Sequence, residues 1–297
     1  MRIFITGSTG FIGKNLVIAL LREGHKLFLY KRKTTNINFS YELNGDFCFI
    51  NDDNLEPCFS KNQIESVIHI ATFYGDDEHA KEIHNANVIF PQKILNLAIK
   101  SKTKSFINTD SFFSKEEFYL GYKKEYVNSK RKFLSALEEA HNQIRIINMR
   151  LEHVFGIGDG KTKFIEWLSN MIITKDAYNP IILSSCDQLR DFISVDDVVS
   201  SYIHVINNIG SLGSFTEFQV GRGKTISVKD FANFLADEFS RNLGKKININ
   251  YDKSLNRKGE VRESYARNKN LVQLGWSPKN DLKTDIENYV KDRCRCI

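Results

Sequence analysis

Short apolar runs alternate with longer amphipathic stretches through the first 150 residues of this 297-residue chain. Runs of three to five mostly apolar residues predict buried strands, and apolar residues spaced three or four apart predict helices that cover them. The predicted strands are 3–5, 27–30, 46–50, 66–70, 105–108 and 145–148, and the predicted helices include 14–21, 84–100 and 123–141. This alternation predicts an α/β fold with a Rossmann-type, doubly wound parallel sheet.

The pattern becomes irregular after residue 155. Helix-like stretches at 164–173 and 228–243 are mixed with a strand-like run at 181–183. We therefore expect a dinucleotide-binding domain at 1–155 and a smaller α/β lobe at 156–297. The helix near 196–206 is a candidate to return to the first domain.

The turn between the first predicted strand and the first predicted helix reads Thr6-Gly7-Ser8-Thr9-Gly10-Phe11-Ile12-Gly13. Gly7 can adopt unusual dihedral angles, Gly10 lets a pyrophosphate approach the main chain, and Gly13 lets the helix pack close to the sheet. The free N–H groups of the helix N-terminus face the phosphates. The predicted cofactor-binding residues of this turn are Gly7, Thr9, Gly10, Phe11, Ile12 and Gly13.

A second signal is the pair Tyr126 and Lys130, which lie four residues apart in a predicted helix and therefore share one face. The phenol and the ammonium have ordinary pKa values of about 10 and 10.4, and the neighbouring cation favours the phenolate. Thr109 stands at the end of a predicted strand, where its hydroxyl can hydrogen-bond a carbonyl oxygen. The alternatives are a solvated helix face and a hydroxyl-rich loop that caps a helix.

The amino-acid composition limits the kinds of molecule that the protein is expected to bind. The chain is 41% hydrophobic and 26% charged, as globular proteins are. Its net charge of +6 is a modest excess spread along the whole chain, and its basic clusters are too short to follow a polyanion. No apolar run approaches the roughly 20 residues of a membrane helix. The five cysteines lack zinc or disulfide spacing, which suits a reducing cytosol. We expect a cytoplasmic protein with no metal, nucleic-acid or membrane partner.

Further motifs occur in the same order along the chain: 150–156 (RLEHVFG), 189–198 (LRDFISVDDV) and 257–261 (RKGEV). Together with the glycine turn and Thr109, Tyr126 and Lys130, they resemble the extended short-chain dehydrogenase/reductase family, in its epimerase/dehydratase branch acting on nucleotide-linked sugars. The resemblance implies a bound nicotinamide dinucleotide and a lobe at 156–297 that binds the nucleotide sugar. It implies that Tyr126 is the acid/base, that Lys130 holds the nicotinamide ribose and lowers the tyrosine pKa, and that Thr109 orients the sugar oxygen.

The resemblance also implies roles for residues beyond this trio. Arg190 and Arg257 would clamp the substrate diphosphate, whereas without the resemblance Arg190 is a salt-bridge partner of Asp191 or its neighbours. His153 replaces an asparagine common in the family, so a substrate contact and a packed histidine both remain open. Ser111 is a further expected substrate contact. Asp52 and Ala71 are further expected cofactor contacts.

Departures from the family pattern indicate which cofactor binds and which reaction follows. Lys31-Arg32-Lys33 stands where a carboxylate usually binds the adenosine ribose of NAD, so Lys31 and Arg32 suit a 2′-phosphate and favour NADPH, with NADH still possible. Ser111 replaces the glutamate that 4,6-dehydratases use as a base, which argues against elimination.

The stretch 108–113 and the 17 positions from Thr109 to Tyr126 are similar to 4-keto-sugar reductases such as CDP-abequose and CDP-paratose synthases. We therefore expect NAD(P)H-dependent reduction of the C4 keto group of a nucleotide-linked 4-keto-6-deoxyhexose in deoxysugar and polysaccharide biosynthesis. A CDP-linked 3,6-dideoxyhexose is one candidate. The alternatives are a C4 epimerase with retained NAD and a catalytically inactive dinucleotide-binding scaffold. The family also implies a homodimer formed through the Tyr126 helix and its neighbour.

Overall fold

The computed structural model describes residues 1–37, 43–115, 123–175 and 179–295. The chain forms two compact units. Unit 1 contains Met1–Leu151 and Val199–Val220, and unit 2 contains Glu152–Val198 and Gly221–Ile297.

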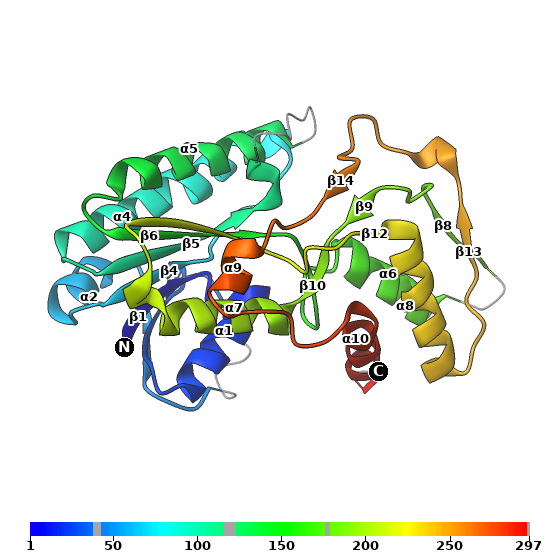
Figure 1. Ribbon diagram of the computed structural model, residues 1–297, viewed down its shortest axis with the longest axis horizontal. Coiled ribbons are helices and arrows are strands. Elements are labelled where there is room, and N and C mark those ends of the chain that lie inside the picture. Colours follow the sequence, from blue (N-terminus) through cyan, green and yellow to red (C-terminus); the bar gives the residue numbers. More distant parts are fainter. Residues whose placement is uncertain (38–42, 116–122, 176–178, 296–297) are drawn as a thin grey trace. The chain divides into compact units, whose positions relative to one another are not determined.

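Unit 1 is built on a seven-stranded parallel sheet in the order β11-β6-β5-β4-β1-β2-β3 (Figure 1). The strands are β1 (Arg2–Thr6), β2 (Lys26–Tyr30), β3 (Phe47–Ile50), β4 (Ser66–His69), β5 (Ser105–Ser111), β6 (Arg145–Leu151) and β11 (Phe215–Val220). The chain crosses the sheet first toward β3 and then back toward β6, which confirms the predicted doubly wound fold. Strand β11 lies within the lobe predicted at 156–297, yet it extends this sheet next to β6.

Helices cover both faces of this sheet. They are α1 (Phe11–Arg22), α2 (Leu55–Lys61), α3 (Ala80–His84), α4 (Phe90–Lys100), α5 (Lys124–Ala140) and α7 (Val195–Asn207), the last of which starts in unit 2. Figure 1 shows α4 and α5 along one side of the sheet, where Ile94 and Leu137 join Phe106 and Ile146 in one apolar cluster.

The predicted helix at 84–100 begins earlier and is interrupted. It starts with α3 at Ala80, and a π-helical turn, η3 (Asn85–Ile89), separates α3 from α4. Pro91 lies in the first turn of α4 and has no N–H to give to the preceding turn. A π-helical turn is one way for a helix to accommodate a missing backbone hydrogen bond.

Unit 2 combines helices with short strands around an aromatic core. Phe231 packs against Phe155 and Phe192, with ring centroids 5.6 and 4.0 Å away. The helices are α6 (Phe164–Thr174), α8 (Val228–Leu243), α9 (Lys269–Gln273) and α10 (Leu282–Arg295). The strands are β7 (His153–Phe155), β8 (Ile181–Leu183), β9 (Leu189–Arg190), β10 (Phe192–Ser194), β12 (Ile226–Ser227), β13 (Ile249–Tyr251) and β14 (Glu263–Ser264).

Among the described residues, no helix combines the length and the apolar character that crossing a bilayer requires.

Candidate active site

The glycine turn between β1 and α1 leaves no room for side chains at two positions. Gly7 has a φ of +71°, and a Cβ atom there would lie 2.6 Å from the backbone nitrogen of Ala71. A Cβ atom on Gly13 would lie 2.0 Å from the carbonyl oxygen of Gly7. Ala71 itself follows β4, and its N–H donates to the Thr6 hydroxyl at 3.3 Å. The expected cofactor residues Gly7, Gly13 and Ala71 are thus neighbours.

The N-terminus of α1 is open to an anion. Gly10 is the N-cap, no side chain caps the helix, and its first turn carries no acidic residue. Helix geometry leaves the N–H groups of Phe11, Ile12 and Gly13 without partners inside the helix. Thr9, Phe11 and Ile12 are half-buried around this end. The turn therefore fits the pyrophosphate of a dinucleotide, which accepts hydrogen bonds from such N–H groups.

Charges of both signs meet where β2 ends. The Lys33 ammonium lies 2.7 Å from the Asp53 carboxylate, with both side chains exposed. The Tyr30 hydroxyl donates to Asp52 at 2.9 Å. Arg32 is exposed, and Lys31 is held by a backbone bond from its N–H to Ile50. The predicted basic cluster is therefore partly balanced by carboxylates that follow β3.

Tyr126 lies on α5 with only 4% of its surface exposed. The hydroxyl groups of Ser111 and Thr72 act to lower the pKa of its phenol. The rings of Tyr74 and Phe113 stand edge-on to it, with centroids 4.9 and 6.1 Å away. Burial raises the pKa of Tyr126 to about 12, and the two hydroxyl groups offset only part of this increase. The phenol is consequently neutral at physiological pH.

Lys130 lies one helical turn beyond Tyr126 and is also buried. Its ammonium donates to the Thr109 carbonyl oxygen at 3.1 Å and lies 6.0 Å from the centroid of the Tyr126 ring. The structure brings the predicted trio together, but the expected lowering of the Tyr126 pKa is wrong here. Desolvation of the phenol outweighs the favourable interactions that would lower its pKa.

The hydroxyl groups of Thr109 and Ser111 have different hydrogen-bond partners. The Thr109 hydroxyl lies 2.7 Å from the Tyr202 hydroxyl on α7, and Tyr202 is fully buried. The Ser111 hydroxyl accepts from the Phe113 N–H at 3.4 Å. Sequence reasoning missed Tyr202, because its spacing from Thr109 follows no helical or strand repeat.

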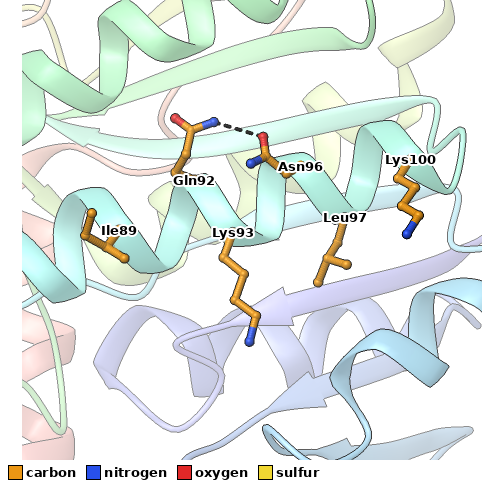
Figure 2. A pocket seen from close by; sticks show the side chains of 6 residues that line it. All are labelled: Ile89, Gln92, Lys93, Asn96, Leu97 and Lys100. Carbon is orange, nitrogen blue, oxygen red and sulfur yellow. Dashed lines mark hydrogen bonds between the residues drawn. The ribbon is translucent and has the colours of Figure 1, made fainter.

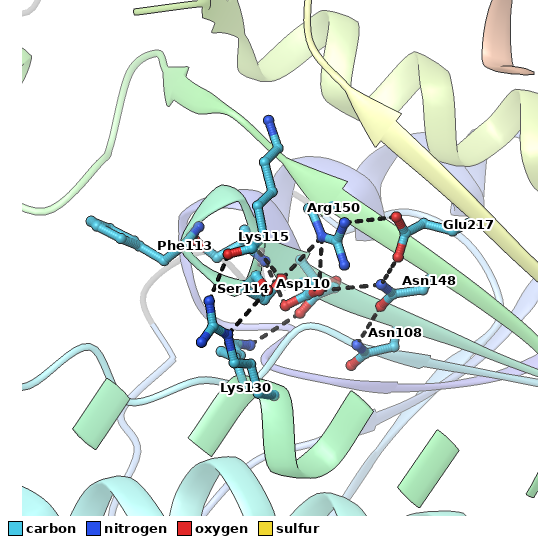
Figure 3. Close-up of polar contacts among 12 residues, drawn as sticks. Asn108, Asp110, Phe113, Ser114, Lys115, Lys130, Asn148, Arg150 and Glu217 are labelled. Atoms are coloured by element: carbon cyan, nitrogen blue, oxygen red, sulfur yellow. Dashed lines mark hydrogen bonds and ion pairs between the residues drawn. The ribbon is translucent and has the colours of Figure 1, made fainter. Parts of the chain in front are cut away.

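Asp110, between these two residues, belongs to a buried polar network that crosses β5, β6 and β11 (Figure 3). Its carboxylate accepts hydrogen bonds from Ser114 at 2.6 Å, Asn148 at 3.2 Å and Arg150 at 3.3 Å. Arg150 also donates to Glu217 at 2.7 Å. These hydrogen bonds tie the Asp110 carboxylate to neighbouring strands of the sheet.

The predicted substrate residues Arg190, His153 and Arg257 all belong to unit 2. The buried Arg190 guanidinium donates to the Leu189 carbonyl at 2.8 Å and lies 3.6 Å from Glu260. The His153 ring packs edge-on against Phe192, with Nδ1 3.7 Å from the Glu152 carboxylate. Arg257 is exposed.

Asp191 does not pair with Arg190. Its buried carboxylate accepts three backbone N–H bonds, from Arg222 at 2.9 Å, Gly223 at 2.8 Å and Ala266 at 3.0 Å. Burial raises the pKa of Asp191 to about 6 despite these bonds. Asp191 therefore fixes the loop after β11.

A separate hollow lies on the surface of η3 and α4 (Figure 2). It is lined by Ile89, Gln92, Lys93, Asn96, Leu97 and Lys100. Ile89 is 55% exposed, and the Gln92 amide donates to Asn96 at 3.1 Å. None of the predicted catalytic or cofactor residues lines this hollow.

Comparison with known proteins gives matches along the whole chain. The model of the NAD dependent epimerase/dehydratase family matches residues 3–221. CDP-abequose synthase of Salmonella typhimurium is 36% identical to the chain over 296 residues. The putative UDP-glucose 4-epimerase of Methanocaldococcus jannaschii is 26% identical over 311 residues. Each alignment covers 97% of both chains. The solved structure of MoeE5 in complex with UDP-glucuronic acid and NAD covers 100% of both chains, with a TM-score of 0.80 and 21% identity.

Proposed function

Because the chain belongs to the NAD dependent epimerase/dehydratase family, as its motifs predicted, we propose that it reduces the C4 keto group of a nucleotide-linked 4-keto-6-deoxyhexose with NAD(P)H. The observation that carries this proposal is the buried pair of Tyr126 and Lys130, whose ammonium donates to the Thr109 carbonyl near the carboxyl end of β5. Ligands of doubly wound sheets bind at that edge. The 36% identity to a CDP-abequose synthase supports a CDP-linked deoxysugar as substrate.

The chain's own residues supply proton transfer and orientation. The bound nicotinamide supplies the hydride for C4. Tyr126 donates its phenolic proton to the oxygen that becomes the new hydroxyl, and its neutral form is the one this step requires. Ser111, which acts to lower the pKa of this phenol, stabilises the phenolate that results. Lys130 holds the nicotinamide ribose, while Thr109, supported by Tyr202, lies beside the reacting oxygen.

The glycine turn and the N-terminus of α1 hold the pyrophosphate of the cofactor. Lys31 and Arg32 bind a 2′-phosphate, so NADPH is the preferred donor. Lys33 contributes less to binding of the 2′-phosphate, because its ammonium already pairs with Asp53. Asp52, which accepts from Tyr30, is the carboxylate that would instead suit NADH.

On the substrate side, Arg190 and Arg257 bind the diphosphate, and His153 and Ser111 contact the sugar. Arg190 is the stronger candidate because its guanidinium is already oriented by the Leu189 carbonyl. Glu260 competes for the same guanidinium at 3.6 Å, so a diphosphate has to displace this contact.

A C4 epimerase with retained NAD is the second candidate, favoured by the alignment with an epimerase at 26% identity. Such an enzyme begins by removing a proton from a sugar hydroxyl, for which Tyr126 has to be a phenolate. Both reactions use the same phenol, and they differ in whether a dinucleotide is consumed.

The decisive test supplies the purified enzyme with NADPH and a CDP-linked 4-keto-3,6-dideoxyhexose and follows the loss of NADPH absorbance. We expect one NADPH oxidised per sugar reduced. Tyr126→Phe should lower turnover about a hundredfold or more, because it removes the proton donor. Tyr251→Phe is the matched control, since that phenol bonds Asn233 in unit 2. Sugar interconversion without net loss of NADPH would establish the epimerase instead.

We also propose that the protein is a homodimer through α4 and α5. The exposed face of η3 and α4 includes Ile89 and the half-buried Leu97. Burying such apolar area favours association. Leu97→Glu should shift the mass measured by light scattering from two chains to one, while Leu255→Glu, at an exposed leucine of unit 2, should leave it unchanged.

A further inference from the structure

The Ser114 hydroxyl is buried and fully engaged at the end of the turn that follows β5. Ser114 is the last residue of the 3₁₀ turn η4 (Phe112–Ser114) and is 3% exposed. Its hydroxyl donates to the Asp110 carboxylate at 2.6 Å, with the Ser111 carbonyl oxygen 2.9 Å away (Figure 3). It also accepts from Arg150 Nε at 3.0 Å. Because a guanidinium can only donate, the hydroxyl proton is directed to the two oxygens.

The partners of this hydroxyl are fixed by the central sheet. The Asp110 carboxylate accepts from Asn148 at 3.2 Å and from Arg150 at 3.3 Å, and both of these donors are on β6, which pairs with β5. Its second oxygen accepts from the Ser111 N–H at 2.8 Å. Ser114 therefore anchors the turn η4 to two inner strands of the sheet.

A second anchor of the same turn comes from α5, the helix that carries Tyr126 and Lys130. Arg131 donates to the Ser114 carbonyl oxygen at 3.3 Å and to the Lys115 carbonyl oxygen at 2.6 Å. The turn is thus bonded on one side to the sheet and on the other side to the helix with the proposed proton donor.

The turn carries two residues that belong to the site. The ring of Phe113 stands edge-on to the Tyr126 ring, with centroids 6.1 Å apart, and is stacked on Phe112 at 4.1 Å. Ser111, the proposed sugar contact, is the N-cap of the turn and accepts from the Phe113 N–H at 3.4 Å. A shift of the turn would therefore move both the aromatic wall of Tyr126 and the Ser111 hydroxyl.

We propose that Ser114 is a positioning residue for the reduction, because its hydroxyl, held by Asp110 and Arg150, keeps Ser111 and Phe113 in place beside Tyr126. This inference rests on the proposed reductase activity. A site has to hold its groups within about 0.5 Å of the productive geometry, so a turn that loses an anchor slows the chemical step. The glycine turn that binds the cofactor is built on β1 and α1, so NADPH binding does not depend on Ser114.

The test measures turnover and cofactor affinity separately. Ser114→Ala removes the hydroxyl, and kcat with NADPH and a CDP-linked 4-keto-3,6-dideoxyhexose should fall about tenfold. The Kd of NADPH in a fluorescence titration should match that of the parent. Ser105→Ala is the matched control, because it removes a buried hydroxyl at the other end of β5, where Ser105 donates to Ser66 at 2.9 Å. It should lower the melting temperature about as much as Ser114→Ala and leave kcat unchanged.

A second pair of variants tests the anchor on α5 through a side chain that is only half-buried. Arg131→Met should also lower kcat with unchanged NADPH affinity, whereas Lys132→Met, at the exposed neighbouring position, should behave as the parent. A parent-like kcat in Ser114→Ala, an equal loss of kcat in Ser105→Ala, or a loss of NADPH affinity that matches the loss of kcat would overturn the positioning role alone. A parent that oxidises no NADPH would overturn the proposed function and this role with it.

Discussion

Replacing Arg150 by methionine tests the buried network beside the active site. The Asp110 side chain is 1% exposed and that of Arg150 is 10% exposed, so the change leaves a carboxylate inside the protein without its cation. Breaking a buried pair from one side costs about 3–5 kcal/mol. Asp110 keeps its bonds from Ser114 and Asn148, which places the expected loss near the lower limit, about 3 kcal/mol.

Urea unfolding followed by circular dichroism measures this loss. Arg295→Met is the matched control, because the Arg295 side chain is 78% exposed in its pair with Asp292 and should contribute less than about 1 kcal/mol. Adding Asp110→Asn to Arg150→Met removes the stranded charge and should recover part of the lost stability. Equal losses for the two arginine variants, or a double variant less stable than Arg150→Met, would refute the reasoning.

Three further predictions concern the glycine turn, the cofactor charge and a buried acid. Gly13→Ala should destabilise the protein by more than about 1 kcal/mol and weaken NADPH binding, because the new Cβ would lie 2.0 Å from the Gly7 carbonyl oxygen. Calorimetry measures the loss of stability. Gly210→Ala is the control, because a Cβ atom at Gly210 has no atom within 4 Å. Arg32→Gln should weaken NADPH binding about tenfold in a fluorescence titration and leave NADH binding unchanged, whereas equal losses would exclude a 2′-phosphate contact. Burial raises the pKa of Asp191 to about 6. The folded protein therefore binds more protons than the unfolded chain between about pH 4 and pH 6. As a result, the contribution of Asp191 to stability falls as pH rises through that range. Asp191→Asn should flatten this part of the profile of melting temperature against pH, and an unchanged profile would contradict the assignment.

The sequence was sufficient for features that depend on local spacing. The parallel sheet followed from apolar runs, and the proximity of Tyr126 and Lys130 followed from four positions of a helix. Strand β11 could not be assigned in this way, because it pairs with β6 across more than 60 residues and its pattern resembles that of any short strand. The strands of unit 2 are two or three residues long, too short to show a period.

The proximity of Thr109, Tyr126 and Lys130 could be predicted from the sequence, whereas the electrostatic environment of Tyr126 could not. A cation four residues from Tyr126 suggested a lowered tyrosine pKa, but desolvation depends on every group that packs around the phenol, including Tyr74 and Phe113. Likewise, the hydroxyl of Thr109 follows a strand as expected, yet its partner Tyr202 lies 93 residues away. Such contacts are consequences of tertiary packing rather than of local sequence.

Reduction and epimerisation use the Tyr126 phenol in opposite order. A reductase starts with the neutral phenol, which donates its proton to the oxygen on C4, whereas an epimerase starts by taking a proton from a sugar hydroxyl. Burial raises the pKa of Tyr126, so the neutral phenol is the form present before substrate binds. Either reaction can follow from that form once a base or an alkoxide meets the phenol. The consumption of NADPH, which only net reduction requires, therefore distinguishes the two reactions better than the protonation state of Tyr126.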